Sequence, residues 1–553
     1  MIFHDSRRET FRRPFGAAET SAPLYLAARC PEAGEMTLRL HAFTGPDRFL
    51  PMAREEGDLF SVTFSAPETP CVLWYSFLAA GQETEPKQLT VYDPAPVPQW
   101  WKQGVVYQIF PDRFARETGW IPLEPAKRKG SHRFLIRDWD TPVFYPRNEK
   151  NDVTSWPFWG GTLRGIREKL PYLRSLGVTV LYLNPIFEAV SNHRYDTADY
   201  TRIDPLLGTE EDFKALCADA EARGVRIVLD GVFNHTGADS VYFDAQGNYG
   251  TGGAYRSWYR FGSQYTHGYE CWWDFKDLPN VEENDPTYRQ FICGEDGVVR
   301  RWLRLGASGW RLDVADELPD SFIRDIRTAM KAEKPDGMLM GEVWEDATNK
   351  ISYGELREYF LGHELDSTMH YPFRELTLDF LRGKIGAAEA CERLWTIKEN
   401  YPPENQYAVM NLIGSHDRER ALTLLDNDKD LFKLAFFLQF ALPGVPCVYY
   451  GDEAGMTGGS DPYNRAPFPW GREDPEMIGY MRTLTAEYAA HPALIDGDYE
   501  PLSFGADVLG CRRRNASESL LALINRSDRA AECFGVTVPA RGRLLCREIG
   551  ESV

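Results

Sequence analysis

The sequence has few cysteines for its length and no long apolar run. Ten cysteines are scattered over 553 residues, from Cys30 to Cys546, without a CxxC pair. This spacing indicates neither a disulfide scaffold nor a zinc site. No stretch approaches membrane-spanning length, and residues 1–19, although rich in arginine, lack the apolar part of a secretion signal. We therefore expect a cytoplasmic protein with reduced cysteines and no membrane partner.

Positive charge is also scarce. The chain has 62 Lys and Arg residues against 82 Asp and Glu residues, a formal net charge of −20. Nucleic acids bind basic surfaces, so we expect no nucleic-acid partner. No G-x-S-x-G elbow is present, which argues against a Ser-His-Asp hydrolase. Aromatic residues are frequent, with 15 Trp and 27 Tyr, and their flat faces suit sugar rings as well as a core.

The two ends of the chain have the pattern of small β-sandwiches. In residues 1–97, short alternating runs such as 36–43 and 71–77 are separated by Gly, Pro and Asp, which predicts an antiparallel sandwich. A proline-rich joint at 93–98 (DPAPVP) marks its end. Residues 493–553 return to short alternating runs and predict a second, C-terminal β-sandwich.

The middle of the chain, residues 98–492, alternates apolar runs with amphipathic stretches, which is typical of parallel βα units. Eight strands with intervening helices predict an α/β fold, a (β/α)₈ barrel, with a doubly wound open sheet as the alternative. No Gly-rich phosphate loop follows the first strand, which disfavours a dinucleotide fold. The predicted strands are 105–110, 180–184, 225–230, 310–314, 338–342, 365–369, 409–414 and 445–450, and the predicted helices include 165–176, 210–223, 286–305, 430–442 and 475–490.

Polar residues lie at the ends of several of these strands. Arg311 and Asp313 project from the same side of an apolar run, and burying them costs several kcal/mol each unless they are paired. An isolated R-x-D is equally well explained as a structural pair. Other strands, however, also end on carboxylates or histidines, and in a barrel these ends build the active site. Paired carboxylates favour glycosidic chemistry. The stretch 236–285 is too long for a plain loop and predicts an inserted subdomain.

Four segments resemble those of the α-amylase family, in the family's order and on the strands where the family has them. They are 230–235 (DGVFNH), 309–314 (GWRLDV), 341–344 (GEVW) and 414–417 (GSHD). The resemblance extends over nearly the whole chain from Tyr107 onward. Three further segments resemble the neopullulanase, cyclomaltodextrinase and maltogenic amylase subgroup. They are 192–200 (NHRYDTADY), 315–317 (ADE) and 450–461 (YGDEAGMTGGSD).

The resemblance implies a retaining hydrolase of α-1,4-glucosidic bonds in cyclodextrins, pullulan and short maltodextrins. Asp313 would be the nucleophile, Glu342 the general acid and base, and Asp417 a hydrogen-bond partner of the reacting sugar's hydroxyls. Asp230 would support the site by hydrogen bonds. The substrate-binding positions would be Tyr195, stacking on the reacting sugar; His235 and His416, contacting its hydroxyls; Arg311, holding Asp313 ionised; Asp461 and Arg465 on the glycone side; and Phe233, Glu317 and Trp344 on the aglycone side.

Two alternatives are enzymes, a maltodextrin glucosidase and a transglycosylating relative. The third is a catalytically inactive carbohydrate-binding protein with the same fold. We expect no required cofactor and no metal site, because segment 112–120 lacks the Asn- and Asp-rich calcium loop of many relatives, although calcium remains possible. The long basic and aromatic segment 115–151 has no explanation from sequence. Arg418 stands where relatives usually have a small Thr. The expected partners are an α-glucan oligosaccharide and, by analogy with the subgroup, a second copy in a homodimer.

Overall fold

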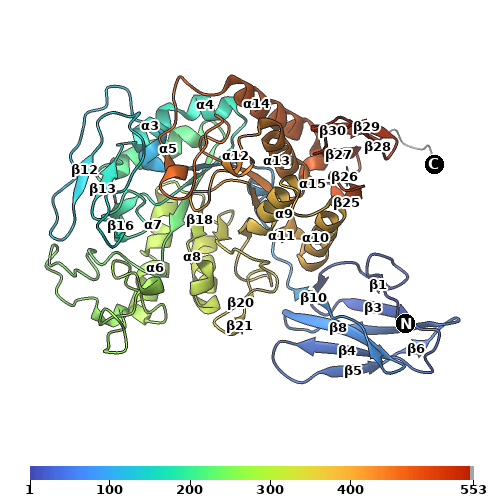
Figure 1. Cartoon of the computed structure of the whole chain (residues 1–553). Coiled ribbons are helices and arrows are strands. Elements are labelled where there is room, and N and C mark those ends of the chain that lie inside the picture. Colours follow the sequence, from blue (N-terminus) through green and yellow to red (C-terminus); the bar gives the residue numbers. More distant parts are fainter. Residues whose placement is uncertain (549–553) are drawn as a thin grey trace.

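The computed structural model describes residues 1–548, so that 549–553 of the predicted C-terminal sandwich lie outside the described residues. A closed barrel of eight parallel strands forms its centre (Figure 1). Apart from Arg226 at the start of the third strand, all eight are buried along their whole length, as strands covered on both faces must be. The predicted (β/α)₈ barrel is confirmed. Its strands are β11 (Val106–Ile109), β14 (Val180–Leu183), β17 (Arg226–Gly231), β18 (Gly309–Leu312), β19 (Met338–Gly341), β22 (Ser367–His370), β23 (Met410–Leu412) and β24 (Val445–Tyr449).

Helices surround the barrel, and several begin at a side-chain cap that the sequence provides. Thr209 and Asp212 form a reciprocal capping box at the start of α5, and Asp428 accepts two backbone N–H groups at the start of α13. The helices of this layer are α3 (Leu163–Glu168), α4 (Leu170–Ser175), α5 (Glu210–Glu221), α6 (Pro286–Cys293), α7 (Val298–Arg304), α8 (Asp320–Glu333), α9 (Tyr371–Leu381), α10 (Ala387–Asn400), α13 (Lys429–Ala441) and α14 (Pro475–Ala490).

The predicted helix 286–305 was wrong as a single element. It is divided into α6 and α7, because the chain leaves the helix at Gly294 and resumes it after Gly297. Gly294 ends α6 with its N–H on the carbonyl of Gln290, and Gly297 provides the extended residue before α7. Two glycines so close together favour such an interruption, since glycine is a poor helix former.

Two sheets at the N-terminus enclose their own apolar cluster, which includes Leu38, Tyr75 and Phe77. They lie beside the barrel, next to α10 (Figure 1). The first sheet has the order β1-β3-β7-β6 and the second the order β2-β10-β8-β4-β5, with β9 paired to β8. The strands are β1 (Arg12–Arg13), β2 (Ala18–Glu19), β3 (Pro23–Arg29), β4 (Thr37–Ala42), β5 (Arg48–Pro51), β6 (Ala53–Arg54), β7 (Leu59–Ser65), β8 (Cys71–Ala79), β9 (Gln82–Glu83) and β10 (Lys87–Tyr92).

The C-terminal strands form a four-stranded antiparallel sheet, in the order β25-β26-β27-β30, and a two-stranded one, β28-β29. A small apolar cluster with Leu521, Leu523 and Val538 lies between them. The strands are β25 (Asp498–Phe504), β26 (Val508–Arg514), β27 (Ser519–Asn525), β28 (Ala531–Cys533), β29 (Val536–Val538) and β30 (Gly542–Arg547). Across residues 1–548, no helix has both the length and the apolar character needed to span a bilayer.

A buried ion pair joins the N-terminal sheets to the barrel. The guanidinium of Arg12, with no exposed surface, lies 2.5 Å from Glu399 on α10. Ser6 donates a second hydrogen bond to the same carboxylate, at 3.0 Å. Thr90 on β10 of the second sheet donates to the carbonyl of Asn400, the next residue of α10, at 2.7 Å. The last turn of α10 is therefore the main polar anchor of the N-terminal sheets.

Replacing Arg12 by Met should destabilise the protein by about 3–5 kcal/mol, because it leaves the Glu399 carboxylate buried without its counter-charge. Urea unfolding followed by tryptophan fluorescence measures the loss. Arg8→Met is the matched control, since Arg8 is 66% exposed and pairs with Asp5 at the surface, where a pair contributes at most about 1 kcal/mol. Equal midpoints for the two variants would contradict the anchor.

Candidate functional site

A cavity of about 1190 Å³ lies at the carboxyl ends of the barrel strands. This volume is slightly above the usual range for ligand sites, roughly 300–1,000 Å³. Asp313 and Glu342 directly follow β18 and β19, so that both side chains enter this end of the barrel. The structure brings ten of the predicted positions to the cavity wall: Tyr195, His235, Asp313, Glu317, Glu342, Trp344, His416, Asp417, Asp461 and Arg465.

Arg311 lies beneath the floor of the cavity and binds three carboxylates. One terminal nitrogen contacts Asp230 at 2.7 Å and Asp313 at 2.6 Å, and the other lies 2.9 Å from Glu342. Burial raises the pKa of Asp313, and the guanidinium opposes that rise by favouring the ionised form. A single cation thus places two carboxylates side by side at the floor.

Glu342 is held from two further directions. It accepts a hydrogen bond from the backbone N–H of Val314 at 2.9 Å and another from the indole of Trp344 at 3.1 Å. Val314 has φ 40° and ψ 56°, a left-handed conformation that costs a β-branched residue about 1–3 kcal/mol. This turn directs the Val314 N–H towards the Glu342 carboxylate. The strained residue is therefore the one that orients the Glu342 side chain.

Tyr195 and His416 form one wall of the cavity. Their rings stack at 5.2 Å with an interplanar angle of 3°, and the Tyr195 hydroxyl lies 2.6 Å from Nε2 of His416. The same hydroxyl donates to Asp230 at 2.8 Å. Gln108 donates to Nδ1 of His416 at 2.9 Å, which leaves the proton on Nε2. Burial lowers the pKa of His416 well below its ordinary value, so that the ring is neutral.

His235 faces the cavity with an unsatisfied nitrogen. Its ring is buried and stacks on Trp272 at 5.4 Å, and its Nε2 has no hydrogen-bond partner. Burial lowers the pKa of His235 to about 4. A buried unpaired ring nitrogen is costly, and at a cavity wall it is a ready partner for a ligand hydroxyl.

Asp417, Arg465 and Asp461 form a linked row along another wall. Arg465 lies 3.4 Å from Asp417 and 3.0 Å from Asp461. Burial raises the pKa of Asp417 to about 7, and the neighbouring charge of Glu342 adds to the rise. The row presents carboxylate and guanidinium groups that can hydrogen-bond neighbouring hydroxyls.

The opposite rim is aromatic. Glu317 accepts hydrogen bonds from the indole of Trp273, at 3.3 Å, and from the hydroxyl of Tyr353. Trp344 stacks on Tyr371 at 4.5 Å, and the guanidinium of Arg418 covers its ring at 4.1 Å. Arg418, the departure from the family pattern, therefore lies against the predicted aglycone side.

Phe233 is not at the cavity, so its prediction as a substrate contact was wrong. Its side chain has no exposed surface and packs on the rings of Tyr200, at 5.8 Å, and Trp310, at 5.6 Å. The chain turns after Gly231, where a side chain would meet the Phe233 ring at 2.6 Å, and the ring fills the core outside the barrel strands. Arg311 is likewise buried and contacts carboxylates, not the cavity space. Asp230 is buried and, as predicted for a supporting residue, lies behind the wall.

Two segments outside the resembling motifs complete the cavity. The inserted stretch 236–285 has little regular structure beyond two 3₁₀ helices, η1 (Arg256–Trp258) and η2 (Trp272–Asp274), and it supplies Trp272, Trp273 and Phe275 to the wall. The second segment, 129–156, supplies Tyr145 and Trp156 among others. Sequence reasoning missed these residues, and the only signal for them was the density of aromatic residues.

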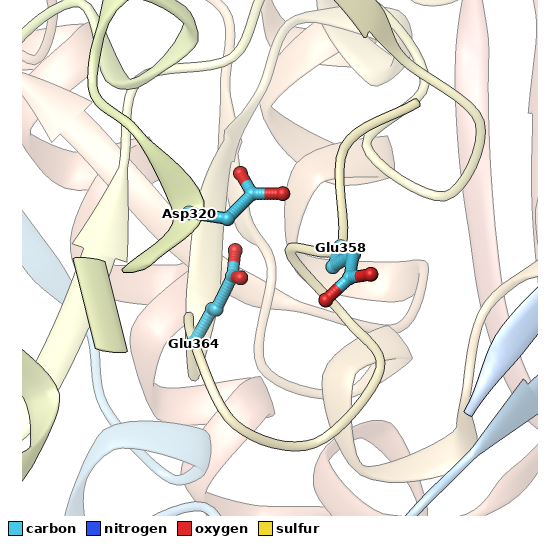
Figure 2. Close-up of side chains that lie close together, drawn as sticks. All are labelled: Asp320, Glu358 and Glu364. Atoms are coloured by element: carbon cyan, nitrogen blue, oxygen red, sulfur yellow. The ribbon is translucent and has the colours of Figure 1, made fainter. Parts of the chain in front are cut away.

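Within residues 1–548, one group of carboxylates lies close enough to hold a metal ion, with ligand atoms within 4.8 Å of one another. Figure 2 shows these side chains, Asp320, Glu358 and Glu364, which are not among the residues of the cavity wall. Two arginines already pair with the group. Arg357 lies 2.5 Å from Asp320, and Arg324 lies 2.6 Å from Glu358 and 3.3 Å from Glu364.

Comparison with known proteins gives consistent matches. Residues 108–487 match the family model "Alpha amylase, catalytic domain". An amylopullulanase of Thermoanaerobacter thermohydrosulfuricus is 35% identical over 92% of this chain and 40% of its own length. A cyclomaltodextrinase of Geobacillus thermopakistaniensis is 35% identical over 81% of this chain and 73% of its own. The ligand-free cyclic α-maltosyl-(1→6)-maltose hydrolase of Arthrobacter globiformis superimposes with a TM-score of 0.71 at 32% identity, over 82% of this chain and 99% of its own. The chain spans less than half of the length of the amylopullulanases that it matches.

Glu364 should make the protein less stable as the pH rises. Burial, with the charge of Asp320, raises the pKa of Glu364 to about 9, so the folded form keeps a proton that the unfolded chain releases above pH 4.5. Stability should therefore fall between pH 5 and about 9, and Glu364→Gln should melt above the wild type at the upper end. Thermal melts across this range measure the effect, with Glu389→Gln, an exposed carboxylate paired with Arg393, as the control. The same change of melting temperature with pH in the wild type and in Glu364→Gln would contradict this role of Glu364.

Proposed function

The chain belongs to the α-amylase family, and on this premise we propose that it is a retaining hydrolase of α-1,4-glucosidic bonds in cyclodextrins, pullulan and short maltodextrins. One observation supports this most: Asp313 and Glu342 enter the same cavity from adjacent strands and share the Arg311 guanidinium. Retaining enzymes need two carboxyl groups only about 5–5.5 Å apart, and two carboxylates on one guanidinium lie close together.

In the proposed mechanism, the Asp313 carboxylate attacks the anomeric carbon and forms a glycosyl ester while Glu342 transfers its proton to the departing oxygen. Glu342 then takes a proton from water, and the resulting hydroxide oxygen displaces Asp313. The Arg311 guanidinium favours the ionised form of Asp313 before attack, against the effect of burial on its pKa. The Val314 N–H and the Trp344 indole hold Glu342 in position. Asp417 and His235 hydrogen-bond the reacting sugar, and Tyr195 stacks on it.

The substrate class is supported by the names of the relatives, which include cyclomaltodextrinases, neopullulanase and amylopullulanases. Products from maltotriose, pullulan and β-cyclodextrin, separated by chromatography, test it. Ring opening of β-cyclodextrin is the expected result. Glucose as the sole early product would instead indicate a maltodextrin glucosidase, and products longer than the substrate a transglycosylating enzyme. Binding of maltodextrin without any cleavage would indicate an inactive carbohydrate-binding protein.

Asp313→Asn should lower kcat on maltotriose by about 10³-fold or more, roughly 4 kcal/mol of barrier, because the amide cannot form the ester. The variant should keep the wild-type melting temperature within a few degrees, since the amide has the shape of the acid. Asp379→Asn, a surface carboxylate paired with Lys384, serves as the control and should retain full activity. Residual activity of Asp313→Asn within about tenfold of wild type would contradict the assignment.

We also propose that no metal or other cofactor is required, because protein donors already bind several oxygen atoms of the segment after β11. Asp112 accepts backbone N–H groups of Trp159, at 3.0 Å, and Gly160, at 3.1 Å. Arg116 donates to three backbone carbonyls at 2.7–2.9 Å, those of Ile136, Arg137 and Trp159. Its guanidinium bridges separate parts of the segment, as a cation with oxygen ligands would.

EDTA should therefore change neither the melting temperature nor the activity, whereas Arg116→Met should lower both, because three backbone carbonyls lose their donor. The two partly buried carbonyls, those of Ile136 and Trp159, account for the loss, at about 1–3 kcal/mol each. Differential scanning fluorimetry and the maltotriose assay measure the two effects. Arg137→Met is the control, because that guanidinium is 69% exposed and pairs with the exposed Glu124. A fall in melting temperature on chelation, restored by calcium, would contradict this proposal.

An α-glucan oligosaccharide is the proposed partner of the site. A homodimer, a cytoplasmic location and the absence of nucleic-acid binding remain predictions from sequence. Light scattering of the purified protein measures the first, and a monomer at all concentrations would contradict it.

A further inference from the structure

The two carboxylate oxygens of Glu342 have different neighbours. Oε2 accepts the backbone N–H of Val314 at 2.9 Å and also lies 2.9 Å from a terminal nitrogen of Arg311. Within residues 1–548, the only donor to Oε1 is the indole Nε1 of Trp344, at 3.1 Å. A proton on Oε2 would face the guanidinium charge, so the proton that Glu342 donates belongs on Oε1. The indole of Trp344 therefore sets the direction of the oxygen that carries the proton.

Two planar groups hold the indole of Trp344 in place. Tyr371 stacks on it at 4.5 Å with an interplanar angle of 7°. Tyr371 is buried and directly follows β22, so the barrel fixes its ring. The second group is the guanidinium of Arg418, which lies 4.1 Å from the centroid of the indole ring. Arg418 belongs to the loop after β23 and directly follows Asp417.

The contact with Trp344 is the main side-chain interaction of Arg418. Among residues 1–548, Glu375 alone offers a carboxylate within ion-pair distance, at 4.0 Å, and both side chains of this pair are more than a third exposed. Exposed pairs of this kind contribute little. The Nε of Arg418 is buried and has no hydrogen-bond partner in the described part of the chain. Indole is the aromatic ring that attracts a cation most strongly, so the ring accounts for the position of the guanidinium.

A cation over the face of an indole also strengthens the hydrogen bond at its edge. The positive charge polarises the ring, and the N–H group becomes a stronger donor. Glu342 becomes a carboxylate when it gives its proton to the departing oxygen, and hydrogen bonds to charged acceptors are about twice as strong as those between neutral groups. The Trp344 N–H therefore contributes most in the transition state, where this charge develops.

We infer that Arg418 is a positioning residue for the general acid: through the ring of Trp344, it orients and strengthens the hydrogen bond on the Glu342 oxygen that carries the proton. This inference rests on the proposed function and deepens it, because it gives Arg418 a part in proton transfer and not in sugar binding. Arg418 is not among the residues of the cavity wall, which agrees with an indirect role. The effect of Arg418 is then confined to substrates whose leaving group needs the proton.

The test compares two α-maltosides with similar aryl groups. Phenol leaves poorly without a proton, whereas 2,4-dinitrophenol departs as a stable anion and needs little help from an acid. Arg418→Met should lower kcat/KM about tenfold on phenyl α-maltoside and at most about twofold on the dinitrophenyl compound. Arg418→Lys keeps the charge and loses the planar contact, so it should lower kcat/KM on phenyl α-maltoside only about threefold.

Two controls separate this role from a general loss of structure. Arg256→Met is the matched variant, because this exposed guanidinium covers the ring of Phe261 at the same 4.1 Å and neither residue belongs to the cavity wall. It should cleave both maltosides at the wild-type rate. Trp344→Phe removes the indole N–H. In that background Arg418→Met should lower kcat/KM on phenyl α-maltoside by less than about twofold, because the donor through which Arg418 acts is absent.

Binding provides a readout independent of catalysis. In Asp313→Asn protein, the affinity for maltotriose, measured by titration calorimetry, should change by less than about twofold when Arg418 is also replaced by Met. Equal losses on the two maltosides, no loss on either, or a clearly weaker binding of maltotriose would overturn the inference. An equal cost of Arg418→Met with and without the indole N–H would overturn it as well. These outcomes leave the proposed function intact, whereas a wild type that cleaves neither maltoside would overturn the proposed function and this inference with it.

Discussion

The chemistry of the whole site depends on the contact of one buried guanidinium with three carboxylates. Without Arg311, the floor of the cavity would bring together Asp230, Asp313 and Glu342 out of water, at a cost of several kcal/mol per ion. With it, and with Glu342 carrying the proton that it donates, the group has one positive charge against two negative ones, so negative charge remains in excess. That imbalance suits a site where positive charge develops on a sugar carbon in the transition state.

The barrel places the reacting groups, and segments outside it determine what can reach them. Strand ends deliver Asp313 and Glu342 to one face with little freedom, because strands β18 and β19 pair in register and are buried throughout. Much of the wall, by contrast, comes from the stretch 236–285 and from the segment 129–156. Substrate choice therefore resides in parts of the chain that can change without disturbing the barrel.

Apolar runs and short motifs predicted the barrel and most of the site, because both depend on local sequence. All eight strands follow from buried runs, and the strand ends identified Asp313, Glu342 and Asp417. The prediction that Phe233 contacts the substrate was wrong because a motif gives the position of a residue along the chain but not the side on which its ring packs after a turn. The prediction of one helix over 286–305 was wrong because the apolar period of this stretch continues across Gly294 and Gly297, where the helix is interrupted. The positions of Tyr145 and Trp156 at the cavity could not be predicted from sequence, because only long-range contacts bring their loop to the cavity.

The bridge made by Arg116 has a consequence for the environments in which the protein can work. A bound ion stabilises a fold in proportion to the logarithm of its free concentration, so a site of that kind weakens wherever chelators or phosphate deplete the ion. A side chain is part of the molecule and has a fixed effective concentration at its partners. The contacts of Arg116 with Ile136, Arg137 and Trp159 are thus made by a group that dilution cannot remove, and these contacts do not depend on the mineral content of the surroundings.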